Sequence, residues 1–556
     1  MKIFKAIKYS TSNKPIDDPI LKSGYDKMIK YNEIYKIRCL IKEICMYEHS
    51  KMTSVDPKSV LPNLNSREIS LFSSQSLTSI LFSQPRFFNT LAYYYGSKNS
   101  LVFPLKRDWF DFFNSQGIIV NKYLCRASWF LFMIIFLMRE ASKYFYSFFS
   151  INKLFSSNER KIINSFNTVY FYDISDSNIP SESQDTTEKN FVNWYKNNVF
   201  KEKSISIIHN VKSRKKSSTQ NKKMTITYKR NLFFNLSLFK EIKIFFWMLK
   251  YLFKNFINKS LSKSILFSTI NEIILAKRIS EYSKENTLHG LVFNSSIGSK
   301  KPLWAVALEN SGTRIDYCFY ACYGEPKDTE GNFPIDGFWS LATWKRYFVT
   351  DVYHKIQLTK ELSNKKVFFS FSNIPWWSDT NISLPKANNK SIALFDTLIS
   401  DSSYTLSTMN QLGWSKFDVV LAYTEIVLEV ASKLNFQIFY KLKRYSSIYN
   451  KDNYQINEIN KLIKKYKADV VFLDPRIAPV RIIEATMLTI SKPISTTALI
   501  AKESGKPSIF LDPLATIKQT DPAIRGITVL YNKLQLEKFL INQIKLVTRG
   551  RINHDR

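Results

Sequence analysis

The chain has 556 residues, of which 45% are hydrophobic and 15% aromatic, so it is long enough for two or three domains with their own cores and is not a disordered protein. Its formal charge of +34 favours an anionic partner: nucleic acid, an anionic membrane surface or a phosphorylated substrate. A biased genome composition rich in Lys, Asn, Ile, Phe and Tyr produces the same excess, so charge alone does not choose among these partners.

The cysteines and the apolar segments favour a reduced, cytoplasmic setting. The five cysteines are scattered without a Cys-x-x-Cys pair, and the five histidines form no ligand pair, so neither a structural zinc site nor any other metal is expected. The N-terminus lacks the apolar core of a secretory signal. The strongest apolar segment, residues 129–138, is far shorter than the ~20 residues of a membrane span.

Residues 1–263 are predicted to form a mainly helical N-terminal region with polar and basic loops over residues 173–230. The basic part of these loops lacks the interleaved aromatics of single-strand binders, so no nucleic acid is expected. Residues 231–256 are apolar and aromatic but broken by lysines. This periodicity fits a helix lying on a membrane face or a surface helix packed on a domain.

From residue 264 onward, helices alternate with short apolar strands, which predicts parallel sheets covered by helices. Helices are expected at 270–285, 303–311, 419–434, 455–466 and 498–504, and strands at 290–293, 315–320, 436–440, 470–473, 488–491 and 508–511. The alternation restarts at residue 390, after a junction near residues 375–385. The predicted fold is therefore α/β, with two Rossmann-like domains (264–385 and 386–545) that face a cleft, and a basic tail at 546–556.

Residues 490–513 form a compact unit of strand, turn, helix and strand. Ser495, Thr496 and Thr497 stand where the helix begins, and their hydroxyls suit the capping of first-turn N–H groups. A helix N-terminus attracts anions, so the unit is predicted to bind phosphate. An ordinary N-cap without a ligand is the alternative.

These residues also carry a family resemblance. The chain reads Pro-Ile-Ser-Thr-Thr-Ala-Leu at 493–499, Gly-Lys-Pro-Ser at 505–508 and Asp-Pro at 512–513. Further landmarks are Asp-Pro at 474–475, Lys-Leu-Lys-Arg at 441–444 and Pro-Trp-Trp-Ser-Asp at 375–379. From about residue 290 to 540 it resembles the polysaccharide biosynthesis proteins named for a Pro-Phe-Thr-Ser motif. It departs from them at Ile494, which replaces Phe, in the inverted order Ser495-Thr496, and at Leu514-Ala515, which replaces a Gly-containing turn.

The resemblance implies a GT-B-like glycosyltransferase of bacterial surface polysaccharide synthesis, for example of capsule or O-antigen. It would transfer a sugar or sugar-like unit from a nucleotide-activated donor to a glycan or lipid-linked acceptor, with no metal or cofactor. The expected location is cytoplasmic, with peripheral contact at an anionic inner membrane face. The implied donor- and phosphate-binding residues are Lys441, Lys443, Arg444, Ser495, Thr496 and Thr497.

Other roles are less specific. Asp474, Glu484 and Asp512 are candidates for nucleotide binding, although structural N-capping explains Asp474 and Asp512 equally well. A catalytic base is expected in the 264–385 block. Glu309 and Asp351 are the two preferred among the candidates, which are Glu309, Asp316, Glu325, Asp336, Asp351 and His354.

Two alternatives stay open. A nucleotide-sugar epimerase uses the same fold, but it needs carboxylates that face the sugar from both domains. A non-catalytic scaffold that binds membranes or nucleic acid would use the basic charge alone.

Overall fold

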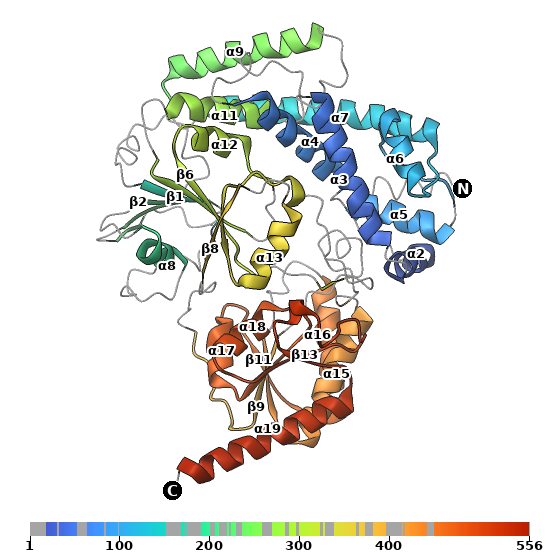
Figure 1. The fold of residues 1–556 in the computed structure, drawn as a ribbon, viewed down its shortest axis with the longest axis vertical. Helices are drawn as coiled ribbons and strands as arrows, with labels where there is room; N and C mark the ends of the chain where they lie inside the picture. The colour runs from blue at the N-terminus through green and yellow to red at the C-terminus, as the bar shows by residue number, and fades with distance from the viewer. Residues whose placement is uncertain are drawn as a thin grey trace. The chain divides into compact units, whose positions relative to one another are not determined.

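The computed structural model describes residues 18–30, 33–52, 64–82, 85–97, 99–151, 168–172, 174, 191–200, 206–210, 219–221, 224–228, 236–257, 270–283, 288–295, 300–322, 326–327, 339–362, 366–372, 382–395, 414, 417–441 and 450–554 (Figure 1). The chain divides into two compact units. The first comprises residues 1–185, 195–320 and 335–374, and the second comprises residues 186–194, 321–334 and 375–556.

The first unit is built on an eight-stranded sheet in the order β3-β4-β2-β1-β5-β6-β7-β8. Its strands are β1 (Thr168–Tyr172), β2 (Ser206–Asn210), β3 (Thr219–Asn221), β4 (Met224–Tyr228), β5 (Gly290–Asn294), β6 (Arg314–Cys318), β7 (Arg346–Val349) and β8 (Phe368–Phe371). All neighbours pair in parallel except β3 and β4, and the strand order reverses between β1 and β5. Strands β5 to β7 are buried almost throughout, as expected for a parallel sheet covered on both faces.

This sheet begins much earlier in the chain than the sequence pattern predicts. Strands β1 to β4 lie in residues 168–228, which were assigned to a helical region with loops, and the expected boundary at residue 264 falls inside the first unit. The short strands β2 to β4 sit within strongly polar and basic sequence, so they lack the apolar run that marks β5 and β6.

The helix-rich N-terminal region is confirmed. It comprises α2 (Pro19–Lys30), α3 (Glu33–Met52), α4 (Ser66–Phe82), α5 (Pro85–Ser97), η1 (Arg107–Trp109), α6 (Phe110–Ser115) and α7 (Lys122–Ile151). Further helices of this unit are α8 (Phe191–Asn198), whose first four residues are grouped with the second unit, α9 (Leu238–Ile257), α11 (Ile270–Tyr282), α12 (Leu303–Asn310), η6 (Trp339–Leu341) and α13 (Val352–Glu361). Among the residues that the structure describes, no helix is long and apolar enough to cross a membrane.

A buried carboxylate on β6 connects the sheet with α8. Asp316 is fully buried, accepts a hydrogen bond from the Tyr195 hydroxyl at 2.5 Å, and pairs with Arg314 at 2.9 Å and Arg346 at 3.3 Å. Burial raises the pKa of Asp316, and the neighbouring arginines oppose that rise. These contacts satisfy both carboxylate oxygens inside the unit, so we assign Asp316 a structural role.

We expect Tyr195→Phe to destabilise the first unit by about 1–2 kcal/mol, because it leaves a buried Asp316 oxygen without its hydroxyl donor. Thermal unfolding of the full chain measures this loss. Tyr347→Phe is the matched control, since the buried Tyr347 hydroxyl finds no hydrogen-bond partner among the described residues. Equal losses in the two variants would contradict the assignment.

The second unit is a six-stranded, fully parallel sheet in the order β11-β10-β9-β12-β13-β14. The strands are β9 (Ser391–Phe395), β10 (Gln437–Lys441), β11 (Asp469–Leu473), β12 (Leu488–Ser491), β13 (Ser508–Leu511) and β14 (Thr528–Leu530). Numbered along the chain, this is the 3-2-1-4-5-6 order of the Rossmann fold. The α/β alternation predicted for this region is confirmed.

Helices cover both faces of this sheet. On one face, Leu394, Ile438 and Ile490 pack with α15 (Phe417–Lys433), α16 (Asn450–Tyr466) and α19 (Lys533–His554). On the other face, Ala393, Phe439 and Leu473 pack with α17 (Pro479–Ala485) and α18 (Thr496–Glu503). Since side chains alternate along a strand, Ser491 points to the same face as α18.

Candidate functional site

The strand order of the second unit reverses between β9 and β12. In open α/β sheets, ligands bind outside the carboxyl ends of the strands at such a reversal. The register brings Phe395 level with Lys441 of β10, and Leu394 level with Ile490 of β12. Lys441 and Ser491 therefore end strands on either side of β9, about 10 Å apart in the sheet.

Helix α18 begins directly after β12, at this reversal. Ser495 is its N-cap residue in extended conformation, and the preceding Ile494 adopts a left-handed φ of 55°. Among the described residues, the Ser495 side chain makes no capping bond to the first turn. Instead, the Thr497 hydroxyl lies 3.0 Å from that of Ser495 and 2.9 Å from that of Ser491.

The Ser495 and Thr497 hydroxyls therefore differ from the sequence prediction: they bond to each other, and Ser495 does not cap the helix. The first turn of α18 consequently keeps N–H groups that no N-cap side chain satisfies, in the position where an anion is stabilised. This region is the candidate functional site.

A segment remote in sequence contacts the start of α18. The backbone N–H of Cys322 donates to the Thr496 hydroxyl at 3.2 Å, and the N–H of Lys327 donates to the Asp521 carboxylate at 2.9 Å. Cys322 also packs against a cluster that contains Trp414, Ala498 and Leu499. The sequence did not predict this contact, because no periodic pattern links residues so far apart in the chain.

Lys441 connects the ends of two strands. Its side chain is 8% exposed, and its Nζ donates to the carbonyl oxygen of Pro475 at 3.0 Å. The neighbouring Asp474 forms an ion pair with Arg476 at 2.7 Å and accepts the backbone N–H of Arg476 at 2.8 Å. Lys441 and Asp474, which were both predicted to bind the donor, thus lie at the carboxyl edge of β10 and β11. Lys443 and Arg444 lie outside the described residues.

Asp512 follows β13 and organises the loop after it. It is fully buried, and its two oxygens accept hydrogen bonds from the backbone N–H groups of Leu514, Thr516 and Ile517, the Thr516 hydroxyl and the indole N–H of Trp414, at 2.7–3.2 Å. These contacts give Asp512 a structural role in the loop, and no helix begins at the residues that it holds, so it is not an N-cap.

Glu484 lies away from the reversal. It is exposed in the last turn of α17, four residues before β12 begins, and so belongs to the amino edge of the sheet.

The two preferred candidate bases of the first unit lie at opposite edges of its sheet. Glu309 lies in the last turn of α12 and pairs with Lys301 at 2.7 Å and with Lys345 at 2.9 Å. Lys345 immediately precedes β7 at the amino edge. Burial lowers the pKa of Lys301 to about 8. Asp351 follows β7 at the carboxyl edge, where its carboxylate accepts the backbone N–H of His354 at 2.7 Å and caps α13. Only Asp351 of the two is at the edge where α/β sheets bind ligands.

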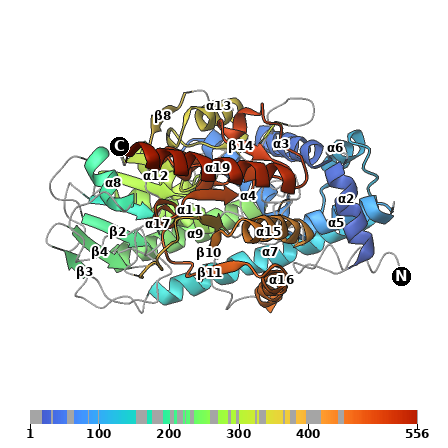
Figure 2. The same cartoon turned by 90° about the horizontal axis from the view of Figure 1, so that it is seen from below.

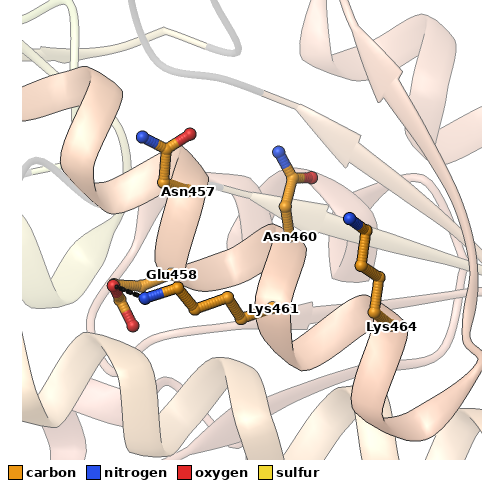
Figure 3. Close-up of a pocket in the computed structure, with 5 residues that line it drawn as sticks. All are labelled: Asn457, Glu458, Asn460, Lys461 and Lys464. Atoms are coloured by element: carbon orange, nitrogen blue, oxygen red, sulfur yellow. Dashed lines mark hydrogen bonds and ion pairs between the residues drawn. The ribbon is translucent and has the colours of Figure 1, made fainter.

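A surface hollow on α16 does not belong to this site. Figure 3 shows its lining side chains Asn457, Glu458, Asn460, Lys461 and Lys464, all of which come from one helix. Lys461 and Glu458 pair with each other at 2.7 Å. Among the described residues, no group of three His, Cys, Asp or Glu side chains could hold a metal ion.

Two sheets with reversed strand order define the chain as an α/β protein of the Rossmann type. The family model of the polysaccharide biosynthesis PFTS motif proteins matches residues 247–540, which is more than half of the 556 residues, and the chain belongs to this family. The resemblance predicted from the motifs at 493–513 is thereby confirmed.

Several solved structures are distantly similar. An alpha,alpha-trehalose 6-phosphate synthase from Burkholderia multivorans is 7% identical, with 68% of this chain and 88% of that chain covered and a TM-score of 0.37. HepE from Anabaena, in complex with UDP and glucose, is 10% identical, with coverage of 68% and 89% and a TM-score of 0.35. The UDP-GlcNAc 2-epimerase from Methanocaldococcus jannaschii is 10% identical, with coverage of 68% and 91% and a TM-score of 0.38. None of the curated proteins matches the sequence. We draw the function from the family and the site, because the structural likeness is distant.

Proposed function

We propose that the protein is a GT-B-like glycosyltransferase of surface polysaccharide biosynthesis. It takes a sugar or sugar-like unit from a nucleotide-activated donor and transfers it to a glycan or lipid-linked acceptor. Membership of the polysaccharide biosynthesis PFTS motif family supports the process. The observation that carries the donor site is the α18 N-terminus, which lies at the β9/β12 reversal without a side-chain cap from Ser495.

In this proposal the donor diphosphate lies at the start of α18. First-turn N–H groups and the Ser495, Thr496 and Thr497 hydroxyls would contact its oxygens, because these donors share one edge of the sheet. Lys441 ends a strand on the other side of β9 and adds positive charge to the same edge. Lys443 and Arg444 follow it in the sequence and are part of the proposal.

The chemistry asked of these groups is stabilisation of the leaving diphosphate. As the glycosyl bond breaks, negative charge develops on the diphosphate, and fixed N–H groups and a cation lower the free energy of that state. This mechanism operates without a metal. Asp474 is the acidic candidate that we assign to the nucleoside, because it follows β11 at the carboxyl edge. Asp351 is the candidate base, because it occupies the corresponding edge of the first unit.

A thermal-shift screen of nucleoside diphosphates and nucleotide sugars tests the donor site. A matching nucleotide at 100-fold its Kd should stabilise the wild type by about 2.7 kcal/mol, which raises the Tm by several degrees. Ser495→Ala and Lys441→Ala should reduce this rise. If no nucleotide raises the Tm of the wild type, the donor-site proposal fails.

Lys506→Ala is the matched control for Lys441→Ala. The Nζ of Lys506 also donates to a backbone carbonyl, that of Thr486 at 3.2 Å, but Lys506 precedes β13 at the amino edge of the same sheet. Both variants lose one ammonium–carbonyl bond, whereas only Lys441→Ala should lose the nucleotide response.

Transfer activity that persists in EDTA would support the metal-free mechanism, and its complete loss would contradict it.

A further inference from the structure

Over residues 122–136 and 138–139, where its side chains are described, helix α7 has one face packed on its unit and one face exposed to solvent. On the inner face, Cys125, Met133 and Phe136 are buried, and Trp129 packs edge-on against Trp109 with ring centroids 5.3 Å apart. The outer face carries six large apolar side chains whose exposed fractions run from 41% for Ile134 to 87% for Tyr123. They are Tyr123, Phe130, Leu131, Ile134, Ile135 and Met138. Figure 2 shows α7 at the margin of the first unit.

The spacing makes these side chains one stripe. Their separations of three, four and seven residues return them to the same side of an α-helix, and from Tyr123 to Met138 the stripe is roughly 22 Å long at 1.5 Å per residue. Soluble proteins rarely expose a contiguous apolar surface of this kind without a partner.

Within the span of the stripe the charged side chains are all positive, and the first carboxylate after it is Glu140. Exposed Lys122 and Arg126 lie at its start and exposed Arg139 lies at its end, whereas the sequence holds no Asp or Glu between residues 112 and 139. A partner for this face should therefore combine an apolar layer with negative charge at its surface.

Helix α9, in the same unit, also has a packed inner face and an outer face with apolar and basic side chains. Its inner face packs through Ile244 and Met248 onto α11, and its single carboxylate, Glu241, turns inward to pair with Arg278 at 2.9 Å. The outer face therefore presents Phe239, Ile242 and Phe246 together with lysines and no acidic group. Both α7 and α9 pack against α11, and α9 lies outermost over it in Figure 1.

We propose that the outer face of α7, assisted by that of α9, lies on an anionic lipid bilayer with its apolar stripe in the headgroup region. A helix with one apolar face and flanking Lys and Arg binds in the plane of such an interface. A second copy of this chain is a poor occupant, because a symmetric contact would bring two cationic faces together. This inference holds whatever reaction the donor site supports.

Sedimentation of the full-length protein with vesicles tests the proposal. The wild type should bind vesicles of mixed phosphatidylglycerol and phosphatidylcholine and should bind pure phosphatidylcholine weakly. Phe130→Gln combined with Met138→Gln should lower binding about tenfold or more, since two exposed apolar side chains are removed from the stripe. Gln keeps the helix propensity of α7, so the circular dichroism spectrum should not change.

Leu534→Gln combined with Leu546→Gln provides the matched control, because both leucines are equally exposed on α19 in the other unit. The control should bind vesicles like the wild type. Three results would overturn the proposal: no binding of the wild type, equal loss in both double variants, or a wild-type dimer in size-exclusion chromatography that only the α7 variant dissociates. Equal binding to neutral and anionic vesicles would contradict the proposed attraction between the Lys and Arg side chains and anionic lipid.

Discussion

Ser495→Asp is expected to stabilise the free protein and at the same time to abolish its response to nucleotides. An aspartate at this N-cap position can accept the first-turn N–H groups of α18 that the serine hydroxyl does not cap, and its negative charge suits a helix N-terminus. The gain should be about 0.5–1 kcal/mol. A donor diphosphate would meet the same N–H groups already occupied and a like charge beside them, so the nucleotide-dependent rise in Tm should vanish.

The opposite signs of the two effects make this test sharper than an alanine variant. A loss of ligand response caused by misfolding would come with a lower Tm, whereas here the Tm of the free protein rises or stays constant. Asn532→Asp is the control: it adds the same charge at the N-cap of α19, where Asn532 already accepts the N–H of Gln535 at 3.1 Å. That variant should keep the nucleotide response. Retention of the response by Ser495→Asp would show that the anion does not bind at α18.

The second unit could be predicted closely because its signals are local. Strand β12 was predicted at residues 488–491, where it lies, and the helix after Ser495 differs from the prediction by two residues at its start. Each of these elements is short, apolar on its buried face and bounded by Pro or Gly. The periodicity of the sequence does not give the strand order. The site depends on that order, because β12 lies beside β9 and α18 therefore begins at the reversal.

The roles of individual polar residues were harder to predict. A sequence shows that Ser495, Thr496 and Thr497 could cap a helix, but Thr497 bonds to the hydroxyls of Ser495 and Ser491, and that choice depends on side-chain geometry after packing. Similarly, Glu309 and Asp351 look alike as acidic residues near strands. Their position relative to β7 separates them, since one sheet edge binds ligands and the other does not.

Asp512→Asn is expected to destabilise the second unit by about 2–4 kcal/mol, even without a ligand. Five donors converge on the Asp512 carboxylate: three backbone N–H groups, one hydroxyl and one indole N–H. An asparagine keeps one acceptor oxygen and turns an NH₂ group toward donors that the second oxygen satisfied. The loop after β13 and its contact with Trp414 should loosen, and thermal unfolding should occur roughly 5–10 °C lower.

Asp521→Asn is the matched control, since the same chemical change is made at a partly exposed carboxylate that accepts only the N–H groups of Ala523 and Lys327 in the described part of the chain. We expect its Tm to fall by less than half as much.

Nucleotide binding should survive in Asp512→Asn at temperatures below its transition, because the carboxylate has no exposed surface to offer a ligand. An unchanged Tm together with a lost nucleotide response would reverse the assignment and make Asp512 a ligand-binding residue. The structural role follows from the count of donors around a fully buried carboxylate, so stability and not affinity is the quantity that must respond first.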